Sequence, residues 1–254
     1  MTRRQGAEGF ESKKKAAKQA KNEDKRKANI KEERQSIIVA CEGTKTECLY
    51  LNNIFRSLKA EHEIASDSLV IAKHKHTDPE GVLDDLLSHS NYQDFTHKWI
   101  VIDRDIARTN GGGHTLVNFN GALARAKSNQ VEVAYSNPCF EIWYLLHLEY
   151  RNTAIDRDKL VKKLETKYGY QKNTLFQEGN VNSAIANAKR LLTLYGRPNP
   201  AIDNPSTTVH KLFKVLESFK KKPEWNVFKI RSLFNLRYSC VLLDVISNFK
   251  SSRF

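Results

Sequence analysis

Three acidic residues follow short apolar runs, at points where the chain is expected to leave a buried strand. Glu42 comes directly after the run Ser36–Cys41, and Asp103 and Asp105 come directly after Trp99–Ile102. If both runs are neighbouring strands of one parallel sheet, their carboxyl ends lie at the same edge. Three carboxylates would then meet in one crevice, where their mutual repulsion favours the binding of a cation.

Oxygen ligands of this kind favour Mg²⁺ or Mn²⁺ over zinc. One or two such ions can polarise a phosphoryl oxygen, activate water and stabilise a leaving oxygen. Asp103 and Asp105 are two residues apart, which in an extended segment points them to one side and Arg104 to the other. The alternative is structural: Glu42 would cap a helix and the two aspartates would form a solvated turn.

The elements that must position these acids follow from the apolar pattern. Short runs without alternation predict strands covered on both faces, at Ser36–Cys41, Ser68–Ala72, Trp99–Ile102 and Val131–Tyr135. Segments with apolar residues at helical spacing separate these strands, as at Leu116–Lys127, and another such segment, Cys139–Leu148, follows the last strand. Strands that alternate with helices predict an α/β fold with a mainly parallel sheet flanked by helices.

Two segments carry the signals of helix starts. Thr44-Lys-Thr-Glu47 matches a capping box, in which a Thr hydroxyl and a Glu carboxylate bond to free backbone N–H groups. Asp78-Pro79 combines an N-cap residue with proline at the first helical position.

The chain divides into three parts by composition. Residues 1–34 form a polar extension, either a solvated tail or a basic arm on nucleic acid. Residues 35–150 form the α/β domain, and residues 151–254 form a mainly helical C-terminal region packed on it. The helices expected in that region include Ile185–Tyr195, Val209–Leu216 and a pair after Val227, whose aromatic residues could belong to a core or to a docking surface.

The charge and the cysteine content limit the class of binding partner and the cellular compartment that we expect. The formal net charge of +13 favours a polyanionic partner, either nucleic acid or an anionic membrane surface. No stretch approaches the ~18 apolar residues that a membrane span needs, and the N-terminus lacks the apolar core of a signal peptide. The four cysteines form no CxxC pair, which disfavours zinc, and reduced thiols fit a cytoplasmic protein.

Several motifs in order resemble the RloB-like family. They are Cys41-Glu-Gly-Thr-Lys-Thr-Glu47 with Tyr50, Ile102-Asp-Arg-Asp105, Ser136-Asn-Pro-Cys-Phe-Glu141 with Trp143 and His147, and Asn204-Pro-Ser-Thr207. The resemblance spans about residues 35–216. It does not cover the first 34 residues and covers the last forty or so only loosely.

The resemblance implies a Toprim-like fold, in which a Glu follows the first strand and a DxD follows a later one. It implies that Glu42, Asp103 and Asp105 hold Mg²⁺ or Mn²⁺ and that Glu42 can act as an acid-base group. It further implies a role in bacterial defence against phage, beside an ABC-type or SMC-like ATPase.

Several further residues have both a functional and a structural interpretation. Glu141 could complete a second metal site and Asn137 could orient a phosphate, or both could belong to a helix start. Lys45 and Lys75 could contact a nucleic-acid backbone, or they could be solvated lysines. His147, among apolar neighbours, fits a core histidine better than a general base.

Two hypotheses of function follow. The first is a metal-dependent endonuclease in which Glu42, Asp103, Asp105 and Glu141 serve catalysis on RNA, such as tRNA, or on DNA. The second is a non-catalytic module that binds nucleic acid or the ATPase through its charge. A polymerase or primase would need a nucleotide site that the sequence does not reveal, and the sequence gives no oligomeric state.

Overall fold

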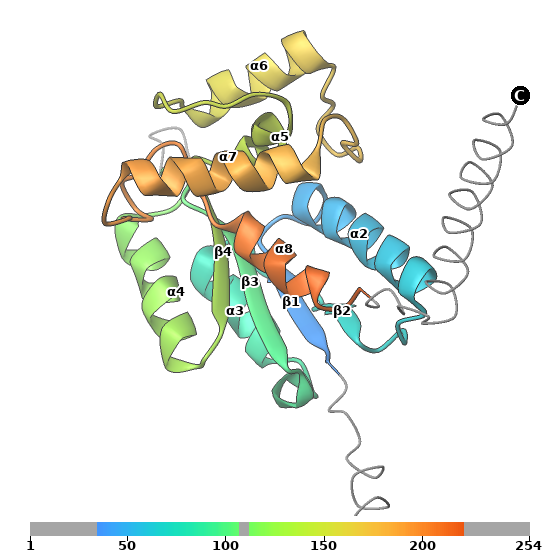
Figure 1. The fold of residues 1–254 in the computed structure, drawn as a ribbon. Coiled ribbons are helices and arrows are strands. Elements are labelled where there is room, and N and C mark those ends of the chain that lie inside the picture. Colours follow the sequence, from blue (N-terminus) through green and yellow to red (C-terminus); the bar gives the residue numbers. More distant parts are fainter. Residues whose placement is uncertain (1–34, 107–111, 221–254) are drawn as a thin grey trace, which may run out of the picture. The chain divides into compact units, whose positions relative to one another are not determined.

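A computed structural model describes residues 35–106 and 112–220 (Figure 1). Its centre is a five-stranded sheet with the strand order β2-β1-β3-β4-β5. The neighbours β2, β1, β3 and β4 pair in parallel, and β5 is antiparallel to β4. The predicted α/β fold with a mainly parallel sheet is therefore confirmed. The strands are β1 (Ile37–Cys41), β2 (Leu69–Ile71), β3 (His97–Asp103), β4 (Glu132–Asn137) and β5 (Ser206–Thr207).

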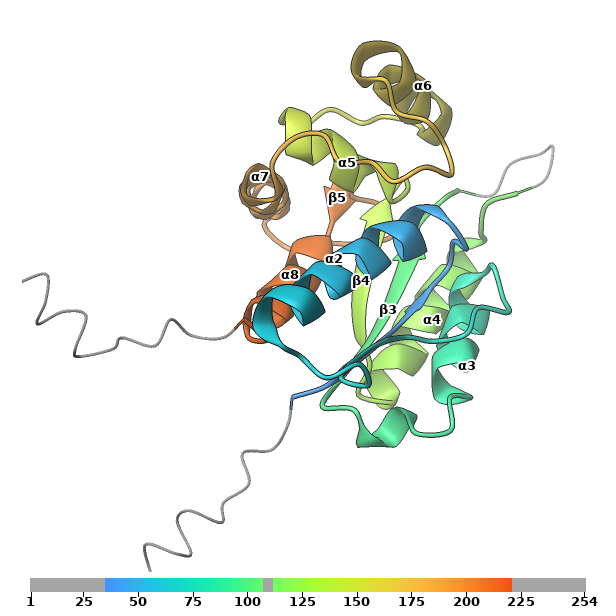
Figure 2. The same ribbon diagram turned by 90° about the vertical axis from the view of Figure 1, so that its right-hand side faces the viewer.

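Helices cover both faces of this sheet, as Figure 2 shows. One face packs against α3 (Pro79–Leu87) and α4 (Leu116–Ser128), and the other packs against α2 (Thr46–His62), α5 (Glu141–Leu148) and α8 (Val209–Glu217). Along β1, Ile38 and Ala40 join the first core while Ile37, Val39 and Cys41 join the second. This two-sided burial explains why the strand is apolar throughout.

The chain beyond residue 150 continues the same compact unit as far as Phe219. It contributes α6 (Arg157–Tyr168), α7 (Val181–Leu194), the edge strand β5 and α8. Earlier in the chain, a short 3₁₀ turn at Tyr92–Asp94 lies between α3 and β3. The predicted helices at 185–195 and 209–216 are confirmed, whereas β5 was not predicted. The N-terminal extension and the helix pair after Val227 lie outside the described residues.

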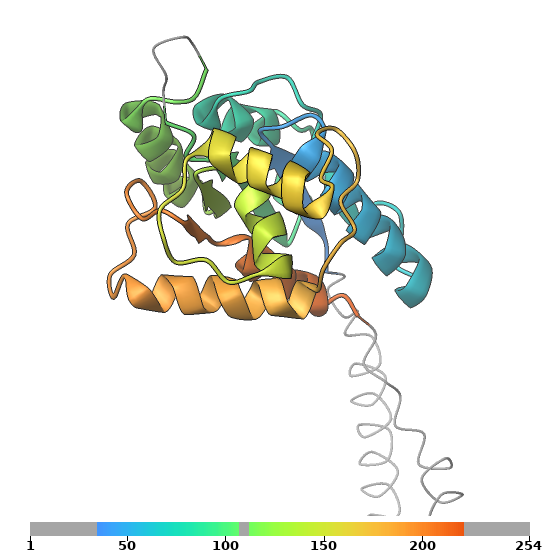
Figure 3. The ribbon, with the colours of Figure 1, turned by 90° about the horizontal axis from the view of Figure 1, so that it is seen from above.

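The end of the sheet where β1, β3 and β4 terminate is covered by helices. Figures 1 and 3 show α5 and α6 there, with α7 beside them. The strand ends and these two helices therefore surround the predicted acidic crevice. In the part of the chain that the structure describes, no helix combines the length and apolarity needed to span a bilayer.

The two predicted helix starts have different outcomes. Asp78 is the N-cap of α3, its side chain accepts a hydrogen bond from Gly81 N, and Pro79 follows as predicted. The capping box at Thr44–Glu47 is wrong, because α2 begins at Thr46 and its N-cap residue Lys45 makes no side-chain capping bond. The carboxylate of Glu47 is buried instead among other acids.

One buried aspartate anchors the loop between β2 and α3. Asp85 accepts hydrogen bonds from Lys75 N (2.7 Å), His76 N (3.0 Å) and the His76 ring (2.7 Å). Burial alone would raise the pKa of Asp85, but these bonds outweigh it and lower the pKa. The stabilisation is therefore present above the ordinary carboxyl pKa and is lost as the pH falls through the lower folded value.

We expect Asp85→Ala to lower the free energy of unfolding by about 2–4 kcal/mol at pH 7, because two backbone N–H groups lose their acceptor. Asp84→Ala is the matched control: its side chain is 53% exposed and pairs with Arg125, which predicts a cost of ~0–1 kcal/mol. Urea denaturation at pH 7 and pH 3 measures both. Equal costs at pH 7, or a cost of Asp85→Ala that does not shrink at pH 3, would contradict the anchoring role.

Candidate active site

Glu42 and Asp103 are in direct contact at the carboxyl ends of β1 and β3. Because these strands are neighbours, Glu42 N donates to Val101 O (3.0 Å), and Asp103 N donates to the Glu42 carboxylate (2.9 Å). The predicted convergence of these two acids from distant parts of the sequence is therefore observed.

Two further carboxylates face the same space. Glu42, Asp103, Glu47 from the first turn of α2 and Glu141 from the first turn of α5 all line a pocket of about 220 Å³. Glu141 also accepts a hydrogen bond from the Tyr170 hydroxyl (3.1 Å). Glu42, Asp103 and Glu141 were predicted to reach this site. Glu47 is the member that the sequence pattern concealed.

Burial makes this arrangement electrostatically unfavourable. Asp103, Glu47 and Glu141 are only 4%, 5% and 2% exposed. Burial, and then the charges of Glu42, Glu47 and Glu141, raise the pKa of Asp103 well above its usual range. Burial chiefly, with the charges of Glu141 and Glu42 adding to it, raises the pKa of Glu47 to about 8.

Gly43 makes room for the Glu47 carboxylate. A side chain at position 43 would place its first carbon 2.8 Å from the carboxyl carbon of Glu47 and nearer still to one oxygen. The absence of a side chain at Gly43 therefore lets the Glu47 carboxylate lie close to the backbone. Larger residues would push the buried carboxylate out of the pocket.

Asp105 lies in a different pocket from Asp103. It lines a neighbouring cavity and forms an ion pair with Arg157. The predicted meeting of Asp105 with Asp103 in one crevice is therefore not observed, although Arg157 lies beside both carboxylates. Regular strand hydrogen bonding stops after Asp103, because Arg104 N and Asp105 N, on consecutive residues, donate to Ser136 O and Pro138 O of the same neighbouring segment. Arg104 faces the other sheet layer as predicted, 5.7 Å from the Phe119 ring centre.

Arg157, from the first turn of α6, joins the two pockets because it lines both. Burial alone would lower its pKa, but the surrounding groups, including Asp103, Asp105 and Glu141, raise the pKa above the ordinary arginine value. Arg157 therefore stays charged and partly offsets the acids. The sequence indicated a helix here and gave no signal that this arginine would enter the site.

His114 is a second residue that the sequence did not single out. Its Nε2 lies 2.5 Å from a Glu42 oxygen, after two glycines with positive φ, Gly112 (80°) and Gly113 (76°). Burial alone would lower its pKa, but the hydrogen bond and charge of Glu42 outweigh this and raise the pKa. Asp103 N and His114 together hold Glu42 from two sides.

The remaining predicted residues are dispersed. Lys45 is exposed at the rim of the carboxylate pocket, and Lys75 is exposed on the β2–α3 loop. Asn137 is the last residue of β4 and is 2% exposed, with its amide donating to Pro200 O (3.3 Å). The interpretation of Asn137 as a helix cap is wrong, since α5 begins at Glu141 with Phe140 as its N-cap residue.

The donor set of the carboxylate pocket suits a hard divalent cation. Its ligands are all oxygens, and Asp103 Oδ1 and Glu47 Oε2 are buried without a hydrogen-bond partner. In residues 35–106 and 112–220, however, no group of three His, Cys, Asp or Glu side chains is arranged so that it could hold a metal ion. Glu42 and Glu141 are engaged by His114 and Tyr170, so these side chains would have to rearrange for an ion to bind.

Comparison with protein-family models gives a match to the RloB-like protein family over residues 37–216. The chain belongs to the RloB-like family. The match includes both pockets and ends within α8, which makes the family segment nearly the same as the described unit. Comparisons with curated proteins and with solved structures returned no match.

The motifs that carry the resemblance to the RloB-like family come together in the fold. Glu42 and Asp103 touch, and the segments around Asn137 and Asn204 meet because β4 pairs with β5 through Asn137 and Ser206. His147, by contrast, is half-buried against the aromatic core, in line with its structural interpretation: its Nε2 lies 3.1 Å from the Tyr50 hydroxyl, and burial lowers its pKa to about 4.

The raised pKa of Glu47 predicts a pH effect on stability. Because the folded protein binds this proton more tightly than the unfolded chain, stability falls as the pH rises from the ordinary value of 4.5 through about 8. We expect Glu47→Gln to reduce this fall by on the order of a few kcal/mol. Urea denaturation in EDTA from pH 5 to 9 measures it.

The control is Glu61→Gln, an exposed position on the same helix, which should follow the wild-type curve. A Glu47→Gln protein that loses as much stability as the wild type between pH 5 and 9 would show that Glu47 titrates normally.

Proposed function

We propose that this RloB-like protein is a Mg²⁺- or Mn²⁺-dependent nuclease that hydrolyses phosphodiester bonds in nucleic acid. The observation that carries the proposal is the meeting of four largely buried carboxylates at the ends of β1 and β3 and the starts of α2 and α5. Such a cluster raises the energy of the folded protein. Two unbonded buried oxygens suggest that a cation is part of its working state.

Each residue has a role that follows from its contacts. Glu42 and Asp103 would hold the ion, with Glu47 and Glu141 as the further oxygen donors within the pocket. Bound there, a hard divalent ion supplies polarisation of a phosphoryl oxygen and activation of water. His114 fixes the orientation of Glu42, and Asp105 holds the Arg157 guanidinium at the pocket wall.

Arg157 is suited to contact the phosphate that reacts. Its guanidinium is a permanent cation with paired donors that match phosphate oxygens. A position on the wall of an acidic pocket lets it attract a polyanion that the carboxylates alone would repel. The surplus positive charge of the whole chain, +13, acts in the same direction at longer range.

The order of these acids, a Glu after the first strand and a DxD after the third, supports a Toprim-like catalytic domain. We further propose a cytoplasmic effector of defence against phage, acting on RNA such as tRNA or on DNA and regulated by an ABC- or SMC-like ATPase. The same net charge also supports a second candidate, a non-catalytic module that binds nucleic acid or that ATPase and in which the acids are structural.

Cleavage assays separate the two candidates. We expect the protein to cut tRNA or plasmid DNA in Mg²⁺, EDTA to abolish cutting, and Asp103→Asn to reduce it by about 10²-fold or more, because the variant removes a charged ligand. Asp103→Asn should retain fold and nucleic-acid binding, since it also relieves repulsion among the acids.

Glu61→Gln is the control for charge and should cut like the wild type. Binding without cutting of either substrate at any Mg²⁺ concentration would favour the non-catalytic module. Cutting that survives both EDTA and Asp103→Asn would contradict the metal-dependent assignment.

A further inference from the structure

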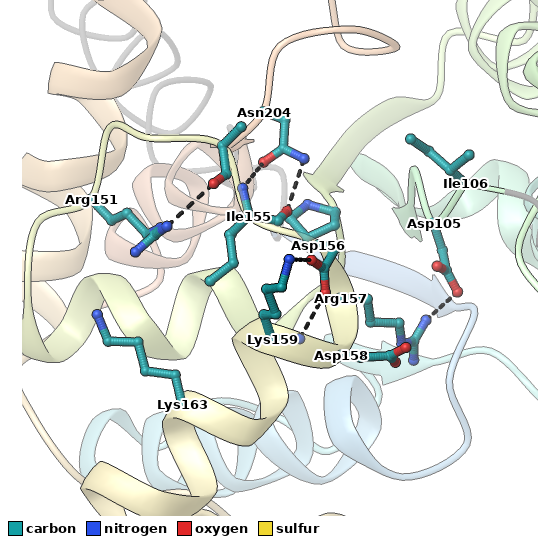
Figure 4. A pocket seen from close by; sticks show the side chains of 12 residues that line it. Asp105, Ile106, Arg151, Ile155, Asp156, Arg157, Asp158, Lys159, Lys163 and Asn204 are labelled. Atoms are coloured by element: carbon teal, nitrogen blue, oxygen red, sulfur yellow. Dashed lines mark hydrogen bonds and ion pairs between the residues drawn. The ribbon is translucent and has the colours of Figure 1, made fainter.

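A second and larger pocket adjoins the carboxylate pocket. It has a volume of about 670 Å³ and lies between the start of α6, the loop before that helix and the segment after β3 (Figure 4). Its volume falls within the range of small-molecule sites. Ile106, Pro138 and Ile155 contribute aliphatic surface to its wall.

Hydrogen bonds hold this wall in a fixed shape. The Asn204 amide binds the main chain of Ile155 from both directions, accepting from its N–H (3.1 Å) and donating to its carbonyl (2.9 Å). Arg151 donates to the carbonyls of Thr153 (2.9 Å) and Ala154 (3.2 Å). The pocket is thus built by the fold, which lowers the entropic cost of filling it.

Cationic groups stand around the aliphatic wall. Arg151, Lys159 and Lys163 line the pocket together with Arg157, as Figure 4 shows. Three aspartates, Asp105, Asp156 and Asp158, line it too, and Lys163 pairs with Glu149, so four cationic groups face three anionic ones. The Lys159 side chain is 81% exposed and pairs with Asp156 only across solvent-exposed surface (2.9 Å). Such a pair is weak and can exchange its partner for a ligand anion. An apolar wall with cations at its edge matches a nucleotide, which has a flat base and an anionic phosphate.

Arg157 links the pockets physically. Because it lines both, a nucleic-acid strand with its reacting phosphate at the carboxylates would pass Arg157 before it reached the larger pocket. Its ion pair with Asp105 holds it at this boundary.

We propose that the larger pocket binds the nucleotide that flanks the reacting phosphodiester, with the base against Ile155 and Pro138 and a phosphate near Lys159. That this nucleotide flanks a reacting phosphodiester rests on the proposed nuclease function. Occupation of the pocket by a nucleotide can be tested without any cleavage.

Ala154→Trp is designed to fill the pocket, because Ala154 lines it and is itself exposed. Ala124→Trp, at an exposed position of α4, is the matched control. Lys159→Glu and Lys162→Glu form a second pair on α6, since Lys159 lines the pocket and Lys162 is exposed outside it. Circular dichroism and thermal melting verify that each variant folds.

Calorimetric titration with AMP, CMP, GMP and UMP in EDTA measures occupation directly. We expect at least one of them to bind, and Ala154→Trp and Lys159→Glu to weaken it by about tenfold or more, while both controls match the wild type. With full-length substrate the two pocket variants should raise KM by a similar factor. Both control variants, Ala124→Trp and Lys162→Glu, should hydrolyse bis(4-nitrophenyl) phosphate like the wild type.

The outcomes distinguish this pocket from the carboxylate centre. Mononucleotide binding that is absent in the wild type, or unaffected by both pocket variants, overturns the nucleotide site even if nucleic acid is cut. Binding that both variants weaken supports the site even if the wild type hydrolyses nothing, in which case the nuclease proposal alone fails. Asp103→Asn should lose hydrolysis and keep mononucleotide binding.

Discussion

The burial of several carboxylates against one another is the constraint on which the rest of this structure depends. Glu42, Glu47, Asp103 and Glu141 come from four separate segments and face one small pocket. Acids placed so closely in a poorly solvated space resist ionisation, as the raised pKa values of Glu47 and Asp103 show. The fold must therefore supply enough packing energy to hold them together.

Local features reduce the cost of this arrangement. The Glu42 carboxylate accepts from Asp103 N and contacts the His114 ring, and Gly43 gives the Glu47 carboxylate space beside the backbone. Arg157 brings a permanent positive charge from α6. Because α6 lies beyond residue 150, the α/β segment alone would lack this guanidinium beside its acids. The C-terminal helices are thus part of the site.

The sequence predicted the sheet and much of the site because these depend on local apolar runs. The runs ending at Cys41 and Ile102 located the first and third strands, and parallel pairing then required Glu42 and Asp103 to meet. The sequence could not reveal Arg157 or His114, since an arginine on a helix and a histidine after glycines have no distinctive spacing. Glu47 was misassigned because Thr-x-x-Glu is also a capping pattern.

The position of Asp105 shows the limit of such arguments. Alternation of side chains holds only while the strand remains regular, and β3 ends at Asp103. From there the backbone follows hydrogen bonds to Ser136 O and Pro138 O, and Asp105 lines the adjoining pocket, where it pairs with Arg157. Where a strand ends is set by its neighbours, here β4 and the segment after it, and that information is not local in the sequence.

The aromatic core beneath α5 explains how Glu141 keeps its place. Trp143 Nε1 donates to the Tyr50 hydroxyl (2.9 Å), and the same hydroxyl lies 3.1 Å from Nε2 of His147, whose pKa burial lowers to about 4. This buried chain ties α5 to α2, the helix that carries Glu47. Two of the four acids therefore stand on helices that are locked to each other by a satisfied polar network. A catalytic centre built from mutually repelling groups requires such support, because the acids would otherwise separate and take the pocket apart.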